Sequence, residues 1–362
     1  MSLVHVGSRS LVCRRDFLRL SALTAVIATA SSVEPQALAA EPGDGLIDVH
    51  AHMVPPFYRE AAVAAGLTYP DGLQMTYPDW SPTAALQLMD KLNIRTAILS
   101  VSSPGVHFGD DRAARALARQ VNEYAADLKA GSPDRFGFFA ALPLPDFDGA
   151  QGEAVHALDV LHADGVVLLS NHAGQYPGDP QFEPLLAELN QRDAVAFVHP
   201  TAPSLACCSY GHLNLPAPVL EFMFETTRMA NNLILSGAVE RFPRIRFIIP
   251  HAGAALPALA DRMTSAPAFV QGLDLTPDQV FAGLRSFYYD LAGSPVPRLL
   301  PVLRTIADPS RIVFGSDYPW TPDFAAEQRK SLLDQALSEE PQLKRAAYQE
   351  NALQLFPRLV AM

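Results

Sequence analysis

Eight short apolar runs, separated by segments with helical spacing, constrain the fold of this chain more than any other feature. They lie at 46–52, 96–103, 135–144, 165–170, 194–200, 245–253, 287–293 and 311–319. Most are continuously apolar, which is typical of strands that are buried on both faces of a parallel sheet. Eight such strands alternating with helices predict a (β/α)8 TIM-type barrel in a single domain, and a doubly wound sheet is the alternative.

The segments between these runs carry helix signals. Ser81 and Pro82 form a cap followed by a first-turn proline, and Leu86, Met89 and Leu92 then recur at helical spacing. The chain has 362 residues and is 49% hydrophobic and 18% charged, so it can bury the core that a barrel of this size needs.

Residues 1–40 differ from the rest of the chain. Arg14 and Arg15 precede an apolar run at 20–30, and small residues follow before residue 41. This order predicts a twin-arginine-type signal peptide at 1–40 and a barrel domain at 41–362. A membrane anchor is less favoured, because the run is shorter than the roughly 20 residues of a transmembrane helix. We therefore expect a soluble protein that is exported to the periplasm or beyond and has no membrane span once the leader is removed.

Net charge and cysteine content exclude several classes of partner. The chain carries −11, to which residues 1–40 contribute +2, so residues 41–362 carry −13. An acidic mature protein argues against nucleic acid or an anionic membrane as a partner. Cys13 lies in the leader, and Cys207 and Cys208 are adjacent, so no disulfide framework is indicated.

Five ionisable side chains stand at the ends of four apolar runs. His50 and His52 end the first, and His199, His251 and Asp317 follow in later runs. In a barrel the carboxyl ends of all strands meet at one mouth, where active sites are built. Alternate residues of a strand share a face, so His50 and His52 can bind one cation, and a third histidine with an aspartate completes a site of the kind that zinc prefers.

Any one of these histidines alone is more often an ordinary hydrogen-bonded residue than a metal ligand. Their coincidence decides the interpretation, since several buried polar groups would otherwise lack partners. The long loops predicted at 53–81, which is rich in proline, tyrosine and glycine, and at 201–218 also leave strand ends, so we expect them to cover the mouth, although the second could equally be surface decoration.

These strand-end motifs, together with "PHAGAALPALADR" and "GSDYP", resemble the metal-dependent amidohydrolase superfamily. They are most similar to the branch that contains aminocarboxymuconate semialdehyde decarboxylase and hydroxybenzoate decarboxylases, over residues 46–355. Within that branch, residues 89–105 and 225–253 look most similar to 6-methylsalicylate decarboxylases. The resemblance implies the barrel fold already predicted.

The resemblance also implies roles for individual residues. His50, His52, His199 and Asp317 would bind one divalent metal ion, zinc or alternatively manganese, and His251 would be a general acid or base beside it. Asp317 would share the catalytic role. Arg262 matches an arginine that binds the substrate carboxylate and that in some relatives reaches into the other subunit of a homodimer. The other interpretation of Arg262 is an ordinary solvated helix residue.

Two reactions are compatible with this residue set. The resemblance favours non-oxidative decarboxylation of a small aromatic carboxylic acid, such as the 2-hydroxybenzoate 6-methylsalicylate, which gives CO2 and a phenol. The same residues could instead activate a water molecule and hydrolyse a lactone, ester or amide. A metal-binding protein without catalytic activity is the nonenzymatic alternative. The residues alone leave open whether Asp317 or His251 delivers a proton.

Overall fold

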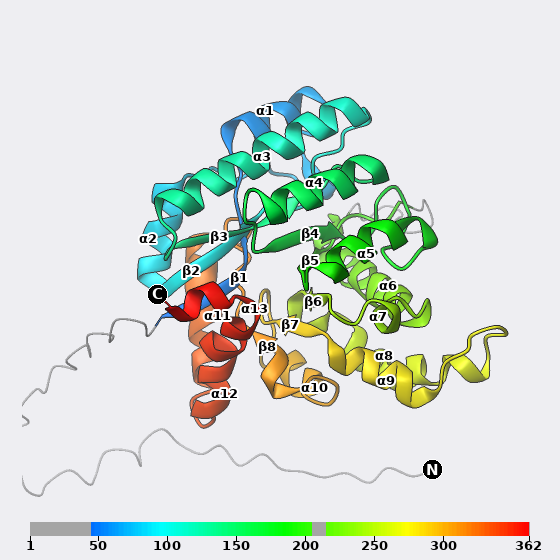
Figure 1. Cartoon of the computed structure of the whole chain (residues 1–362). Coiled ribbons are helices and arrows are strands. Elements are labelled where there is room, and N and C mark those ends of the chain that lie inside the picture. The colour runs from blue at the N-terminus through cyan, green and yellow to red at the C-terminus, as the bar shows by residue number, and fades with distance from the viewer. Residues whose placement is uncertain (1–44, 205–214, 362) are drawn as a thin grey trace, which may run out of the picture. The chain divides into compact units, whose positions relative to one another are not determined.

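A computed structural model describes residues 45–204 and 215–361, which form an eight-stranded barrel surrounded by helices (Figure 1). The predicted signal peptide at 1–40 lies outside the described residues, and so do Cys207 and Cys208. In the part of the chain that is described, no helix is both long and apolar enough to cross a lipid bilayer.

The eight strands follow one another in sequence order around the barrel, and each pair is parallel. Bridges from Asp48 to Phe314 and from Ala51 to Tyr318 join the last strand to the first. This arrangement confirms the predicted barrel and excludes the doubly wound sheet. The strands are β1 (Leu46–His52), β2 (Ile94–Ser100), β3 (Phe136–Ala141), β4 (Gly165–Leu169), β5 (Val195–His199), β6 (Arg246–Ile249), β7 (Tyr288–Asp290) and β8 (Ile312–Val313).

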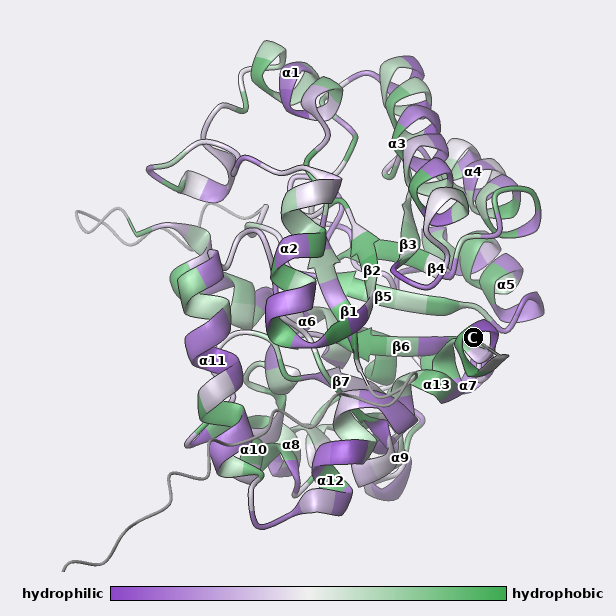
Figure 2. Ribbon diagram, turned by 90° about the vertical axis from the view of Figure 1, so that its left-hand side faces the viewer, coloured by the Kyte–Doolittle hydropathy of each residue, from purple (hydrophilic) through white to green (hydrophobic). Residues whose placement is uncertain are grey.

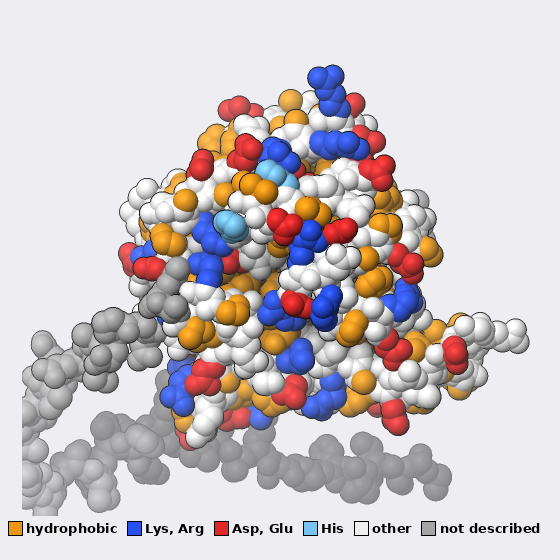
Figure 3. Space-filling model, viewed as in Figure 1, with side chains coloured by type: hydrophobic (Ala, Val, Ile, Leu, Met, Phe, Trp, Pro, Cys, Tyr) orange, Lys and Arg blue, Asp and Glu red, His pale blue; other side chains and the backbone are white. Residues whose placement is uncertain are grey.

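The helices lie outside the strands, and hydrophobic and hydrophilic residues alternate along them (Figure 2). They are α1 (Pro56–Ala64), α2 (Pro82–Leu92), α3 (Asp111–Gly131), α4 (Phe147–Asp159), α5 (Glu183–Gln191), α6 (Glu221–Leu235), α7 (Ala238–Arg241), α8 (Leu256–Thr264), α9 (Pro277–Ser286), α10 (Leu299–Leu303), α11 (Asp323–Ala336), α12 (Pro341–Arg345) and α13 (Asn351–Leu355). Basic and acidic side chains intermingle on the outer face shown in Figure 3.

Helix α2 begins where its sequence predicts. The Ser81 hydroxyl accepts a hydrogen bond from the Ala84 backbone N–H at 3.1 Å, and Pro82 occupies the first turn. Met89 and Leu92 are buried against the barrel. A side-chain cap and a first-turn proline also start α9, whereas α3 and α4 begin with an aspartate cap alone.

Several strands are shorter than the apolar runs predicted. The run at 245–253 continues only to Ile249 as a strand, because Pro250 has no N–H to donate and His251 has a φ of 56°. The run at 311–319 ends as a strand at Val313, and Asp317 has a φ of 62°. His251 and Asp317 therefore lie in turns just beyond their strands, which re-aim both side chains across the barrel mouth.

The long segment at 53–81 differs from the loop that its composition suggests, because it contains α1. Pro56 starts this helix, and Tyr58 and Ala62 bury one face of it. The Tyr58 hydroxyl donates to the Gly105 carbonyl oxygen at 2.8 Å, which fastens the segment to the loop after β2. The segment is thus anchored over the carboxyl end of the barrel.

Aromatic side chains fill the barrel below its mouth. Phe139 of β3 and Phe197 of β5 stack with ring centroids 5.2 Å apart, and Phe197 also meets His50 edge-on at 4.8 Å. At the opposite end of the strands, Arg358 donates from Nε to Asp164 at 2.5 Å. The barrel is therefore a packed core with one open end, as its class requires.

Candidate metal centre and active site

Strand β1 supplies two of the predicted ligands. Asp48, His50 and His52 alternate with Ile47 and Val49, so the three polar side chains face the barrel interior, and all three are buried. A Cβ atom at position 315 would lie 2.7 Å from the Cβ of His50, so only glycine allows the segment after β8 to approach β1 so closely.

The other two predicted ligands come from the far side of the mouth. His50, His52, His199 and Asp317 each offer one ligand atom, and these atoms lie within 4.8 Å of one another. Asp317 Oδ1 lies 3.5 Å from His50 Nε2 and 3.3 Å from His52 Nε2. Its backbone N–H donates to the His50 carbonyl oxygen at 2.7 Å, which fixes the aspartate turn against β1.

A partner on the far nitrogen orients each imidazole. His50 Nδ1 lies 2.8 Å from Asp290 Oδ2, His52 Nδ1 lies 3.0 Å from the Ser100 hydroxyl, and His199 Nδ1 lies 2.7 Å from its neighbour's carbonyl oxygen. This leaves Nε2 of each ring for the shared centre. In the described residues, Nε2 of His50 and Nε2 of His52 are buried without a hydrogen-bond partner, as expected of metal-ligating nitrogens.

The electrostatics of the cluster favour a cation. Burial alone would lower the pKa of His50, but the charges of Asp290 and Asp317 and their hydrogen bonds raise it to about 10. Burial lowers the pKa of His52, and burial together with the other imidazoles holds the pKa of His199 well below its usual range. One buried carboxylate, Asp290, and one partly buried carboxylate, Asp317, thus favour positive charge in a cluster where the pKa values of two of the three imidazoles are lowered. A divalent metal ion would supply that charge.

The donor set therefore fits a metal ion, and the four side chains form a divalent metal site. Three imidazoles, each neutral when it binds a metal, and one carboxylate suit zinc or manganese, and they leave room for a substrate or water ligand. Asp317 is suited to remain charged in this site, because its contacts with His251, His50 and His52 outweigh burial and hold its pKa well below the usual range.

Substitution Asp290→Asn is expected to lower the metal affinity about 10- to 100-fold, the usual effect of removing an outer partner of a ligating histidine. Asp290 is fully buried and orients His50, and its other oxygen accepts the His251 backbone N–H at 3.0 Å. Titration of the apo protein with Zn2+ or Mn2+ measures the affinity. An unchanged affinity in a folded variant would show that Asp290 does not orient the ligand.

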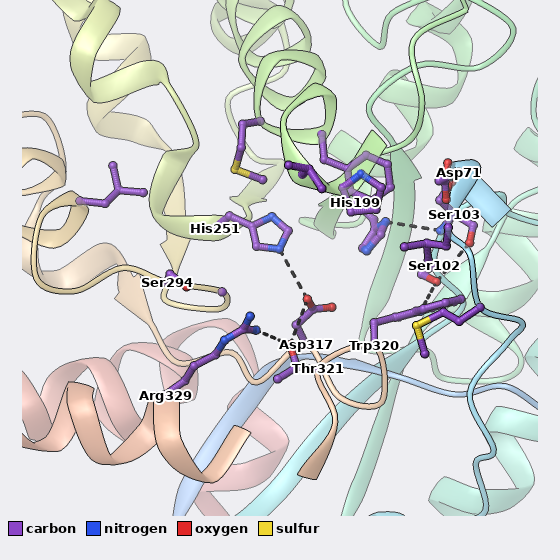
Figure 4. A pocket seen from close by; sticks show the side chains of 18 residues that line it. Asp71, Ser102, Ser103, His199, His251, Ser294, Asp317, Trp320, Thr321 and Arg329 are labelled. Carbon is purple, nitrogen blue, oxygen red and sulfur yellow. Dashed lines mark hydrogen bonds and ion pairs between the residues drawn. The ribbon is translucent and has the colours of Figure 1, made fainter. Parts of the chain in front are cut away.

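His251 lies beside this centre but outside the four ligands. Its Nε2 is 3.8 Å from Asp317 Oδ2, and its ring points across the cavity toward Asp317 (Figure 4). The ring is 5.1 Å from that of His50, centroid to centroid. Nδ1 of His251 is buried, and no hydrogen bond to it is found among the described residues, so the protein does not lock the ring in one tautomer. Such a group can accept or donate a proton near the metal.

A cavity of about 420 Å³ opens above the metal site, within the range of about 300–1,000 Å³ that small-molecule sites occupy. One part of its wall is polar and another apolar. The residues that line it are Asp71, Leu73, Met75, Ser102, Ser103, His199, Pro218, Val219, Phe222, Met223, His251, Gly293, Ser294, Leu299, Asp317, Trp320, Thr321 and Arg329. Both long segments expected to cover the mouth contribute to this wall.

Asp71 fastens the first of these segments to the rim. Its Oδ1 accepts hydrogen bonds from the Ser103 hydroxyl at 2.9 Å and from the Ala202 backbone N–H at 3.2 Å. Burial raises the pKa of Asp71 to about 6. Nearby, Trp320 donates from its indole N–H to the Ser102 hydroxyl at 2.6 Å, so the aromatic wall is held in place.

The structure separates the predicted site residues into two groups. His50, His52, His199, His251 and Asp317 converge on one centre, whereas Arg262 is exposed on α8 and does not line this chain's cavity. Its expected role across a homodimer stays a prediction. The sequence analysis missed the supporting groups Asp48, Asp290, Asp71 and Arg329. Only Asp290 carries a clear signal, as an acidic residue that closes an apolar strand.

A parallel eight-stranded barrel with three histidines and an aspartate around one cavity defines the class of metal-dependent barrel enzymes. The sequence profile of the amidohydrolase family matches residues 47–358, and the chain belongs to this family.

Named relatives extend over most of the chain. The 6-methylsalicylic acid decarboxylase acuB of Aspergillus aculeatus is 38% identical over 322 residues, which cover 86% of this chain and 96% of that protein. The decarboxylase yanB of Aspergillus niger is 37% identical over 324 residues, covering 86% and 87%. Among solved structures, a dihydroxybenzoic acid decarboxylase from a Polaromonas species, with bound manganese and the inhibitor 2-nitroresorcinol, is 25% identical with a TM-score of 0.71, covering 86% and 97%.

Proposed function

We propose that this protein is a metal-dependent, non-oxidative decarboxylase of a small aromatic carboxylic acid. A 2-hydroxybenzoate such as 6-methylsalicylate is the favoured substrate, and CO2 and a phenol are the products. The observation that carries the proposal is the convergence of three histidines, one aspartate and His251 on one small cavity. The decarboxylase relatives, similar over 86% of the chain, support it.

Each part of the cavity has a task in this reaction. A bound divalent ion would hold the carboxylate and the ortho hydroxyl group of the substrate and so fix its orientation. Zinc is the ion we favour for this mostly imidazole site, and the manganese in the Polaromonas structure makes that ion the alternative. Phe222, Leu299 and Trp320 provide apolar wall for the aromatic ring.

The chemistry needs one proton at the ring carbon that bears the carboxylate. When that carbon is protonated, the bond to the carboxylate breaks, its electron pair returns to the ring, and CO2 leaves. His251 is our favoured donor, because it faces the cavity and is not one of the four ligands. Asp317 is the alternative proton donor, but its lowered pKa keeps the carboxylate ionised, and an ionised carboxylate carries no proton to donate.

The decisive test follows CO2 and phenol together. Purified, metal-loaded protein is given 6-methylsalicylate and related 2-hydroxybenzoates, with and without a chelator. Equal amounts of CO2 and phenol, both lost on chelation, are the expected result. Hydrolysis of a lactone, ester or amide panel without CO2 from any aromatic acid would instead establish the hydrolase alternative. Metal binding without either activity would indicate a protein that is not an enzyme.

Two further proposals concern the chain outside this cavity. We propose that residues 1–40 direct export by the twin-arginine pathway, which an uncleaved amino terminus in the cytoplasmic fraction would contradict.

We also propose that the exposed Arg262 reaches the cavity of a second copy in a homodimer. A monomer in solution with full activity would contradict this arrangement.

A further inference from the structure

Arg329 is a cationic side chain of the cavity wall to which the proposed decarboxylation assigns no role. Arg329 lies on α11, is partly buried and lines the cavity. It is the sole lysine or arginine among the residues that line this cavity. Its Nη1 donates to the Thr321 hydroxyl at 2.5 Å, which uses one of the five N–H donors of the guanidinium.

No ion pair of Arg329 is found within residues 45–204 and 215–361. Other charged groups of α11 are engaged elsewhere, since Glu327 pairs with Lys91 at 2.7 Å and Lys330 pairs with Asp334 at 2.8 Å. The chain as a whole is acidic, with a net charge of −11. The protein thus holds one positive charge in the cavity wall that its own acidic residues do not neutralise.

Arg329 is also close to the metal site. Thr321, which accepts its hydrogen bond, lies with Oγ1 3.4 Å from Asp317 Oδ2. Figure 4 shows the guanidinium directed toward Thr321 and Asp317. If the carboxylate of an aromatic acid binds at the metal site, it therefore lies near the Arg329 guanidinium.

We propose that Arg329 binds the carboxylate of the aromatic acid, from within the same subunit as the metal site. A planar guanidinium matches a carboxylate with two parallel hydrogen bonds, which an ammonium group cannot do. This inference rests on the proposed function for the identity of the ligand, but not on turnover. It gives each subunit its own carboxylate-recognition group, independent of Arg262.

The expected consequence is discrimination between an acid and its neutral amide. A hydrogen bond to a charged group contributes enough affinity that its loss weakens binding about 10- to 100-fold. Arg329→Met should therefore weaken binding of 2-hydroxybenzoate by about that factor. Binding of 2-hydroxybenzamide, which has the same ring and hydroxyl group but no charge, should change less than about threefold, because the carboxylate contact is the one removed.

Calorimetric titration of the metal-loaded full chain tests the proposal. All variants carry His251→Asn, so that slow turnover does not disturb the measurement. Arg329→Met is compared with Arg329→Lys, which keeps the charge and should recover part of the affinity for the acid. The matched control is Arg304→Met, which removes an exposed arginine paired with Glu340 at 2.8 Å and should change neither affinity.

Three results would overturn the proposal. The parent protein could bind the acid no more tightly than the amide, or Arg329→Met could leave the affinity for the acid unchanged. The variant could also weaken both ligands equally and lose its metal, which would make Arg329 a support of Asp317 through Thr321. CO2 release by the enzyme with His251 intact is measured separately. Failure of the proposed reaction therefore remains distinct from failure of carboxylate binding.

Discussion

Substitution His251→Asn is expected to lower the rate of CO2 release about 10²- to 10⁴-fold, the usual contribution of a positioned acid or base. His251 faces the cavity with Nε2 3.8 Å from Asp317 Oδ2, and it is not one of the four metal ligands. Asparagine has a similar reach and retains hydrogen-bonding groups, but it does not titrate. The variant should therefore keep its fold and its metal while it loses the proton donor.

Three measurements on the same preparation check this prediction. They are the rate of CO2 release, the metal content and the melting temperature. The control is His107→Asn, because His107 lies away from the metal site and its Nε2 pairs with Asp111 at 2.8 Å. A His251→Asn enzyme that turns over at the parent rate would transfer the proton-donor role to Asp317. Loss of metal in that variant would instead assign His251 a structural role.

The sequence predicts the barrel well because its signals are local. A continuous apolar run indicates a strand buried on both faces, and eight of them leave few architectures. The metal ligands are predictable for the same reason, since His50 and His52 share a face by alternation alone. The placement of His251 and Asp317 beyond their strands depends on turn geometry, with positive φ at both residues, and no periodicity reveals it.

The groups that support the site are set by tertiary packing. Asp290 meets His50 across 240 residues of sequence, and Asp71 reaches Ser103 and Ala202 from a segment whose composition predicts only a loop. Arg329 lies in a helix at a position that local charge spacing cannot separate from an ordinary surface arginine. These side chains belong to the site because the fold places partners that are distant in sequence beside them, and the neighbouring sequence does not indicate those partners.

Loss of one metal ligand should have the largest effect on the whole protein. We expect His52→Ala to lose its metal on dialysis and its turnover to fall to background, because Nε2 of His52 is a buried ligand atom without another hydrogen-bond partner among the described residues. Metal content by elemental analysis and CO2 release measure both effects. Asp290→Asn, which removes only an outer partner, should keep a weaker site and so separates ligation from orientation.

Thermal unfolding gives this prediction a readout that does not depend on activity. A ligand at 1,000 times its Kd stabilises the folded state by about 4 kcal/mol, so a chelator should lower the melting temperature of the parent protein by several degrees. The same chelator should leave His52→Ala unchanged, because that variant has no metal to lose. Equal responses of the two proteins would place the metal elsewhere. A parent protein that does not respond would mean that the buried imidazoles and carboxylates form a hydrogen-bonded cluster rather than a metal centre.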